Sequence, residues 1–239
     1  MGVGVSVGCM VVGSVLVTGG SGGLGRAVVA AFVEAGWRVV VPERTARPGS
    51  GPAADELVRL VAGLTEPEGA ARAVEVAADT PAAPLRAVVN LVGGYASGGL
   101  VHETPVEEFE RMLTLNLRPT YLVTQAALPH LVAAGGGAVV CVSARAALAP
   151  FPGAAGYVTA KAAVLAFANA VAVEYRSRNV RCNTVLPSVI DSPANRAAQP
   201  DADHSRWVPP AEIATVIRFL ASAESAPTSG ATVPVYGRA

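Results

Sequence analysis

Short apolar runs alternate with longer helical patterns along this 239-residue chain, and that alternation constrains the fold more than any other feature. Several of the short runs are continuously apolar, as expected of parallel strands that helices cover on both faces. The alternation predicts a single α/β domain spanning 1–239, with a doubly wound, seven-stranded and mostly parallel sheet. The strands are expected at Ser14–Thr18, Arg38–Val41, Leu57–Val61, Ala87–Leu91, Ala138–Val142, Arg181–Leu186 and Thr232–Val235. The helices are expected near 23–36, 66–78, 105–134, 156–178 and 209–223.

The composition agrees with this sheet and argues against several classes of function. Apolar residues make up 51% of the chain, charged residues make up 15%, and the formal net charge is +0. A neutral chain has no excess of basic residues to attract nucleic acid or an anionic membrane surface. The three cysteines, Cys9, Cys141 and Cys182, lack metal-ligand spacing, so we expect no metal site and a reducing compartment.

The first residues of the chain are apolar, contain no basic residue and run directly into the first strand. A signal peptide would begin with a charged segment, and a membrane span would need about twenty apolar residues. We therefore expect residues 1–10 to form an extension ahead of the first strand. We also expect a cytoplasmic protein with no membrane partner.

A glycine-rich turn follows the first strand. Residues 18–25 are TGGSGGLG, and they lead into an amphipathic helix. The glycines allow the backbone to turn tightly and to approach a pyrophosphate, which the helix N-terminus then stabilises. This predicts a Rossmann-type dinucleotide site with six contacts from the turn. They are Gly19, Ser21, Gly22, Gly23, Leu24 and Gly25.

A tyrosine and a lysine form the candidate catalytic pair. Tyr157 and Lys161 are four residues apart in a helical stretch, so both side chains face the same site. A tyrosine pKa near 10 is too high for easy proton exchange at neutral pH. A neighbouring ammonium and a cationic nicotinamide would lower the pKa of Tyr157, which could then exchange a proton with the substrate.

In this order, the motifs resemble those of the short-chain dehydrogenase/reductase family over the whole chain. Gly19, Gly23 and Gly25 match the family's Thr-Gly-x-x-x-Gly-x-Gly spacing. Residues 90–93 resemble the element after its fourth strand, and residues 183–187 resemble the Asn-x-x-x-Pro run after its sixth. The resemblance implies an NAD(P)-dependent oxidoreductase.

The resemblance also implies roles for individual residues. Lys161 would hold the nicotinamide ribose as well as acting on Tyr157, and Asn116 would fix a water in the proton path. Long helices commonly build the subunit interface in this family, so we expect a homo-oligomer, either a dimer or a tetramer. Further cofactor contacts would come from Leu64, Asn90, Gly93, Pro187 and Val189.

The choice of cofactor depends on the end of the second strand. Glu43 would accept hydrogen bonds from the adenosine ribose and repel a 2′-phosphate, which favours NAD over NADP. Arg44 beside it could instead pair with a 2′-phosphate. Gly63 stands where many family members have an aspartate near the adenine, so that contact is expected to be lost.

The serine that the family usually has thirteen residues before the tyrosine is missing, because Ala144 occupies that position. Ser143 is one residue early, and successive residues at a strand end point to opposite sides. A local bulge could still bring its hydroxyl to the substrate. Ser143 therefore remains a candidate catalytic residue.

A closer resemblance, to dihydropteridine reductase-like members, includes an alanine at this position. Residues 144–148, 92–95 and 186–207 match that group, although this chain keeps Asn116. The match implies a conjugated imine or quinonoid substrate, which needs no serine to polarise it. Residues 187–210 would form a lid, anchored by Trp207 and Val208. Candidate substrate contacts are Tyr95, Ala144, Arg145 and Trp207.

Three functions are thus compatible with the sequence. The first is an NAD(P)H-dependent reductase of a small pteridine-like compound. The second is a carbonyl reductase or alcohol dehydrogenase that uses Ser143. The third, from another class, is a dinucleotide-binding sensor without catalysis.

Overall fold

The computed structural model describes residues 12–46 and 56–238, so the expected extension at 1–10 lies outside the described residues. Seven strands form one sheet in the order β3-β2-β1-β4-β5-β6-β7, and every neighbouring pair is parallel. This confirms the Rossmann-type α/β prediction, with a fully parallel sheet. The strands are β1 (Ser14–Thr18), β2 (Arg38–Glu43), β3 (Leu57–Val61), β4 (Leu85–Asn90), β5 (Gly137–Val142), β6 (Val180–Pro187) and β7 (Thr232–Val235).

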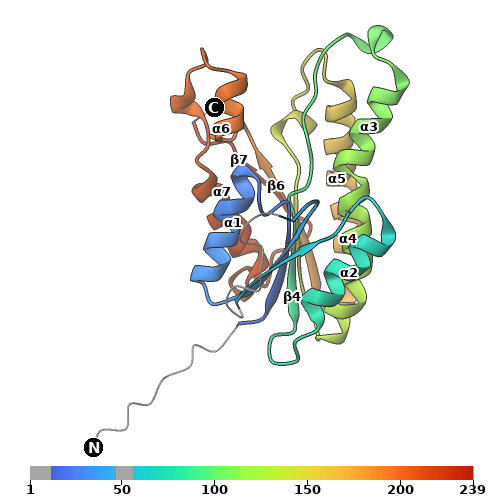
Figure 1. The fold of residues 1–239 in the computed structure, drawn as a ribbon, viewed down its shortest axis with the longest axis vertical. Coiled ribbons are helices and arrows are strands. Elements are labelled where there is room, and N and C mark those ends of the chain that lie inside the picture. The colour runs from blue at the N-terminus through green and yellow to red at the C-terminus, as the bar shows by residue number, and fades with distance from the viewer. Residues whose placement is uncertain (1–11, 47–55, 239) are drawn as a thin grey trace, which may run out of the picture.

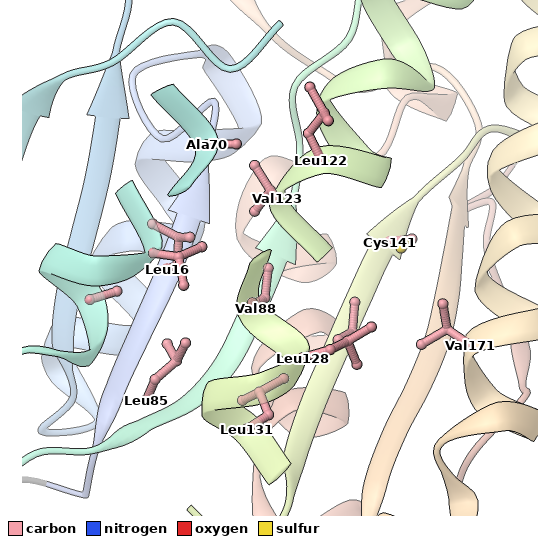
Figure 2. Close-up of a cluster of buried hydrophobic side chains, with 14 of the residues drawn as sticks. Leu16, Ala70, Leu85, Val88, Leu122, Val123, Leu128, Leu131, Cys141 and Val171 are labelled. Carbon is pink, nitrogen blue, oxygen red and sulfur yellow. The ribbon is translucent and has the colours of Figure 1, made fainter. Parts of the chain in front are cut away.

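Helices cover both faces of the sheet (Figure 1). One face packs against α1 and α7, and the other packs against α2, α4 and α5, with α3 lying along α5. Figure 2 shows part of the hydrophobic core between the sheet and α2, α4 and α5, where Leu16 and Val88 of the sheet approach Val123 and Leu131 of α4. The helices are α1 (Gly23–Glu34), α2 (Pro67–Ala78), α3 (Val106–Asn116), α4 (Arg118–Ala133), α5 (Ala155–Glu174), α6 (Pro193–Ala198) and α7 (Pro210–Ala221).

The single helix predicted over 105–134 is wrong, because the structure divides it into α3 and α4 at Leu117. Pro119 has no N–H group to donate to the Leu115 carbonyl, so the helical hydrogen bonding is interrupted there. The break matters for the site, because Asn116 is the last residue of α3 and is buried.

The expected lid segment, 187–210, contains a short helix that the sequence patterns did not predict. The segment leaves β6, forms α6 and is joined to itself by an isolated parallel bridge between Ile190 and Val208. Val208 is fully buried, whereas Trp207 is only half-buried.

Among the described helices, α5 is the one long and apolar enough to span a membrane, with a mean hydropathy of 1.5. Its residues Ala160, Val164, Ala168 and Val171 are buried in the domain. A helix that packs against a central sheet meets the same criterion of length and composition.

Candidate active site

A cavity of about 660 Å³ lies along the carboxyl edge of the sheet, where α/β folds bind their ligands. Four segments from different strand ends meet around it, namely 19–22, 42–45, 62–65 and 91–93. The predicted cofactor residues in its wall are Gly19, Ser21, Gly22, Glu43, Arg44, Leu64 and Gly93. Wall residues absent from the prediction are Pro42, Thr45, Ala62, Thr65, Leu91, Val92, Leu115 and Pro119.

The glycine turn places the N-terminus of α1 directly beside this cavity. Gly19 has a φ of 68°, and a Cβ on Gly25 would lie 2.1 Å from the Gly19 carbonyl oxygen. The first turn of α1 therefore packs directly on the glycine turn. No side chain caps the helix at Gly22, so its first N–H groups can bind an anion. The cavity and the turn together fit a dinucleotide whose pyrophosphate lies at α1.

Three predicted cofactor residues belong to α1 and lie outside the cavity wall. They are Gly23, Leu24 and Gly25. Gly23 contacts the lid segment instead, because a Cβ there would be 2.8 Å from Cβ of Ser192. The predicted contacts Pro187 and Val189 lie at the start of the same segment and are not in the cavity wall.

Glu43 is buried at the end of β2 and faces the cavity. Its carboxylate accepts a hydrogen bond from Ser21 at 2.6 Å and pairs with Arg59 at 2.8 Å. Sequence reasoning missed Arg59, although a lone arginine within the apolar strand Leu57–Val61 was a visible signal. The pairing reduces the negative charge that Glu43 presents to a nucleotide.

Asn90, predicted as a cofactor contact, has its side chain bonded within the core. Its side chain is buried and donates to Thr124 Oγ1 at 3.0 Å and to Cys141 Sγ at 3.8 Å. It therefore points into the core between β4, α4 and β5, where it joins the ends of these elements. Gly93, three residues later, lines the cavity.

The predicted catalytic residues meet beside Gly93. A Cβ on Gly93 would lie 2.6 Å from Asn116 Oδ1 and 3.2 Å from Lys161 Nζ. Lys161 Nζ donates to the Val142 carbonyl at 3.2 Å and lies 6.0 Å from the ring centroid of Tyr157. The structure therefore brings Asn116 and Lys161 together beside Gly93 at the edge of the cavity, with the Tyr157 ring near Lys161.

Asn116 holds the backbone of this region. Its side-chain amide donates to the Gly94 carbonyl and its Oδ1 accepts from the Gly94 N–H, both at 3.1 Å. The same amide donates to the Met112 carbonyl at 3.0 Å. Its side chain thus fixes the loop that follows β4.

Burial shifts the pKa values of both catalytic groups. Desolvation lowers the pKa of Lys161 to about 8, and the nearby Cys141 opposes this shift. Desolvation raises the pKa of Tyr157 to about 12, and Tyr95 adds to the increase. The protein's own groups therefore do not lower the pKa of Tyr157 as the sequence analysis expected.

Ser143 directly follows β5, and its side chain is directed at the backbone of α5. Ser143 is buried, and its hydroxyl donates to the Lys161 carbonyl at 2.7 Å. The hydroxyl thus ties β5 to α5 and is directed at the helix backbone. The bulge that would bring Ser143 to the substrate is not present, because the β5–β6 register runs regularly through Val142 and Val185.

Of the predicted substrate residues, Tyr95 is the one in contact with Tyr157. The two rings meet edge to face with centroids 5.1 Å apart, and Phe151, which the prediction missed, lies 6.4 Å from Tyr95. Arg145 instead extends toward Tyr236 after β7, with its guanidinium 5.1 Å from that ring centroid. Trp207 packs against His204 at 4.2 Å.

Comparisons with known proteins agree on the family. A family model described as short chain dehydrogenase matches residues 13–203. The 2-(R)-hydroxypropyl-CoM dehydrogenase of Xanthobacter autotrophicus is 33% identical over 241 residues, which cover 93% of this chain and 96% of that protein. The 2,5-dichloro-2,5-cyclohexadiene-1,4-diol dehydrogenase LinX of Sphingobium indicum is 30% identical, with coverages of 93% and 94%.

Solved structures give the same result. A short-chain type dehydrogenase/reductase from Mycobacterium ulcerans superposes with a TM-score of 0.87 at 26% identity, covering 96% of this chain and 90% of that one. These similarities support the broad family. They do not support the closer resemblance to dihydropteridine reductase-like members.

Proposed function

The chain belongs to the short-chain dehydrogenase family, and on that premise we propose that it is an NAD(P)-dependent enzyme interconverting an alcohol and a carbonyl compound. The observation that supports this best is the position of Asn116 and Lys161 beside Gly93 in the cavity wall, with the Tyr157 ring near Lys161. The relatives named above are dehydrogenases of hydroxy compounds, which favours this substrate class over the pteridine-like imine.

In the proposed reaction, the cofactor would transfer the hydride, and Tyr157 and Lys161 would transfer the proton. The nicotinamide, when bound, accepts a hydride from the alcohol carbon or returns it to the carbonyl carbon. Tyr157 takes the alcohol proton in one direction and gives a proton to the carbonyl oxygen in the other. Lys161, with a pKa of about 8, can exchange protons with Tyr157 and solvent near neutral pH.

The cofactor would lie with its pyrophosphate at the N-terminus of α1 and its adenosine beside Glu43. Because Arg59 compensates the Glu43 carboxylate, we propose that both NAD and NADP bind, with NAD moderately preferred.

Substitution of Tyr157 tests the catalytic role. NAD(P)H oxidation would be followed with a panel of ketones, and the reverse reaction with the matching alcohols. Tyr157→Phe should abolish turnover while leaving cofactor binding unchanged, and Tyr121→Phe on the surface of α4 is the matched control. Cofactor binding without turnover on any substrate would favour the alternative of a sensor.

A second candidate substrate class remains an activated imine, and Ala144 is the observation that favours it. An electrophilic C=N bond depends less on a second hydrogen bond to the substrate than a ketone does. The same assay with a quinonoid pteridine and a cyclic imine distinguishes the two classes. Faster turnover of the imines than of every ketone would reverse the order proposed here.

The lid and the subunit interface belong to the same proposal. Residues 187–210 would cover the bound substrate, because Ser192 already lies against Gly23 at the cofactor turn. A homo-oligomer would form through the exposed surface of α4 and α5, around Tyr121 and Phe167.

A further inference from the structure

We propose that the Tyr95 hydroxyl donates the second hydrogen bond to the substrate oxygen, the bond that Ala144 cannot give. This inference rests on the proposed function, because it assigns a catalytic residue to the same reaction. A carbonyl oxygen has two lone pairs, so it can accept from Tyr157 and from one further donor. That donor must be a side chain close to Tyr157.

The polar side chains nearest the missing serine are already engaged with the backbone. Ser143 donates to the Lys161 carbonyl at 2.7 Å and is buried. The Asn116 amide is bonded to the Gly94 and Met112 carbonyls. Lys161 is buried and donates to the Val142 carbonyl. The Ser143 hydroxyl and the Asn116 amide could not turn to a substrate without breaking a buried hydrogen bond, which costs about 1–3 kcal/mol.

Tyr95, by contrast, has an accessible hydroxyl beside Tyr157. The residue is 61% exposed, and its ring stands edge to face with that of Tyr157, at an angle of 85° and with centroids 5.1 Å apart. Its hydroxyl donates to Ser97 Oγ at 2.7 Å in an exposed hydrogen bond, which a substrate oxygen could replace at little cost. Tyr95 also raises the pKa of Tyr157, as expected when the two phenol groups interact electrostatically.

The loop that carries Tyr95 is fixed on both sides. Asn116 holds Gly94 through two hydrogen bonds, and the Gly98 N–H donates to the Gly153 carbonyl at 2.8 Å. The ring of Phe151 also lies beside that of Tyr95, with centroids 6.4 Å apart. A donor held in this way can stabilise the charge that develops on the substrate oxygen without first having to be ordered.

Tyr95→Phe tests the proposal, because it removes the hydroxyl and keeps the ring contacts. With a ketone that the wild-type enzyme reduces, kcat should fall about 100-fold while KM changes less than about threefold, as is typical when one oxyanion donor is lost. Ser97→Ala is the matched control. It removes the partner of Tyr95 and keeps the donor, so kcat should stay within about twofold of the wild type.

A second test restores, at position 144, the serine that is usual in the family. Ala144→Ser in the Tyr95→Phe background should raise kcat at least about tenfold above that of Tyr95→Phe alone, because the new hydroxyl replaces the missing donor. Wild-type kcat in Tyr95→Phe would overturn the proposal, and so would a double variant that stays as slow as Tyr95→Phe. A wild-type enzyme inactive on every alcohol and ketone would reject the proposed function itself, and this inference with it.

Discussion

Lys161 is a buried cation, and its position lowers the stability of the folded protein. Its side chain is 7% exposed, its ammonium donates to the Val142 carbonyl, and desolvation lowers its pKa from 10.5 to about 8. Between these two pH values the unfolded chain binds more protons at this lysine than the folded chain does. The free energy of unfolding therefore rises with pH across that window, as the destabilising effect of Lys161 is lost.

Lys161→Met should accordingly stabilise the protein at neutral pH while abolishing activity. The shift corresponds to about 3 kcal/mol, and loss of the hydrogen bond to Val142 offsets about 1 kcal/mol, leaving a net gain of about 2 kcal/mol. Denaturant unfolding at about pH 7 and about pH 9.5 measures the free energy of unfolding of both proteins. The difference in favour of Lys161→Met should be smaller at the higher pH. A gain that grows with pH, or a variant less stable at both values, would contradict this account.

Arg59 controls how strongly Glu43 discriminates between the two cofactors. Removing the guanidinium 2.8 Å from the carboxylate would increase the repulsion between Glu43 and a nucleotide 2′-phosphate. Arg59→Met should raise the ratio of the KM for NADP to the KM for NAD by roughly tenfold, or about 1.4 kcal/mol. Initial-rate kinetics with both cofactors measure the ratio. Arg111→Met, on the exposed surface of α3, is the control, and an equal change there would point to a general charge effect.

The sequence predicted several residues that the structure places close together, but it did not predict where their side chains point. Tyr157, Lys161 and Asn116 were predicted, because their spacing and order are family features. The side-chain directions of Ser143 and Asn90 depend on which neighbouring element lies within reach, which a linear pattern does not contain. Arg59 and Phe151 reach the site only through the pairing of β3 with β2 and through the contact with Tyr95.

At the scale of elements, the contact between α1 and the glycine turn determines whether the cofactor cavity exists. A Cβ on Gly25 would lie 2.1 Å from the Gly19 carbonyl oxygen and 2.6 Å from the Gly20 Cα. Since these are backbone atoms, the helix itself must move away from β1. Movement of α1 would also shift the N–H groups that bind the pyrophosphate.

Gly25→Ala should therefore cost roughly 2–3 kcal/mol of stability and weaken cofactor binding at least about tenfold. Thermal unfolding and calorimetric titration with NAD(P) measure the two effects. Gly63→Ala is the control, because Gly63 also lines the cavity but has no atom within 4 Å of its added Cβ. Equal losses in both variants would show that the close approach of α1 is not the cause.

The elements themselves were largely predictable. All seven strands were expected within a few residues, because a strand buried on both faces leaves a short apolar run between turns. The division between α3 and α4 was missed although Pro119 was visible, because the apolar pattern continues past it. The short helix α6 was missed because six residues contain too few turns for a periodic pattern.

At the scale of the whole molecule, the two helical layers differ in what they expose. On one side, the rings of Tyr121 and Phe167, with centroids 5.6 Å apart, line a shallow depression of about 420 Å³ formed by α3, α4 and α5. Tyr121 is 45% exposed there. The apolar helix α5 thus presents part of its length to the outside, which is typical of a face that a second subunit covers.

Tyr121→Arg should therefore convert the proposed oligomer to a smaller species, because a symmetric interface would place the new charge near its own copy in the partner. Phe219→Arg is the matched control. Phe219 is 40% exposed on α7, on the opposite face of the sheet, and its substitution should leave the assembly unchanged. Light scattering coupled to size-exclusion chromatography measures the mass of both variants. If Tyr121→Arg kept the wild-type mass while Phe219→Arg lowered it, the interface would lie on the α1 and α7 side instead.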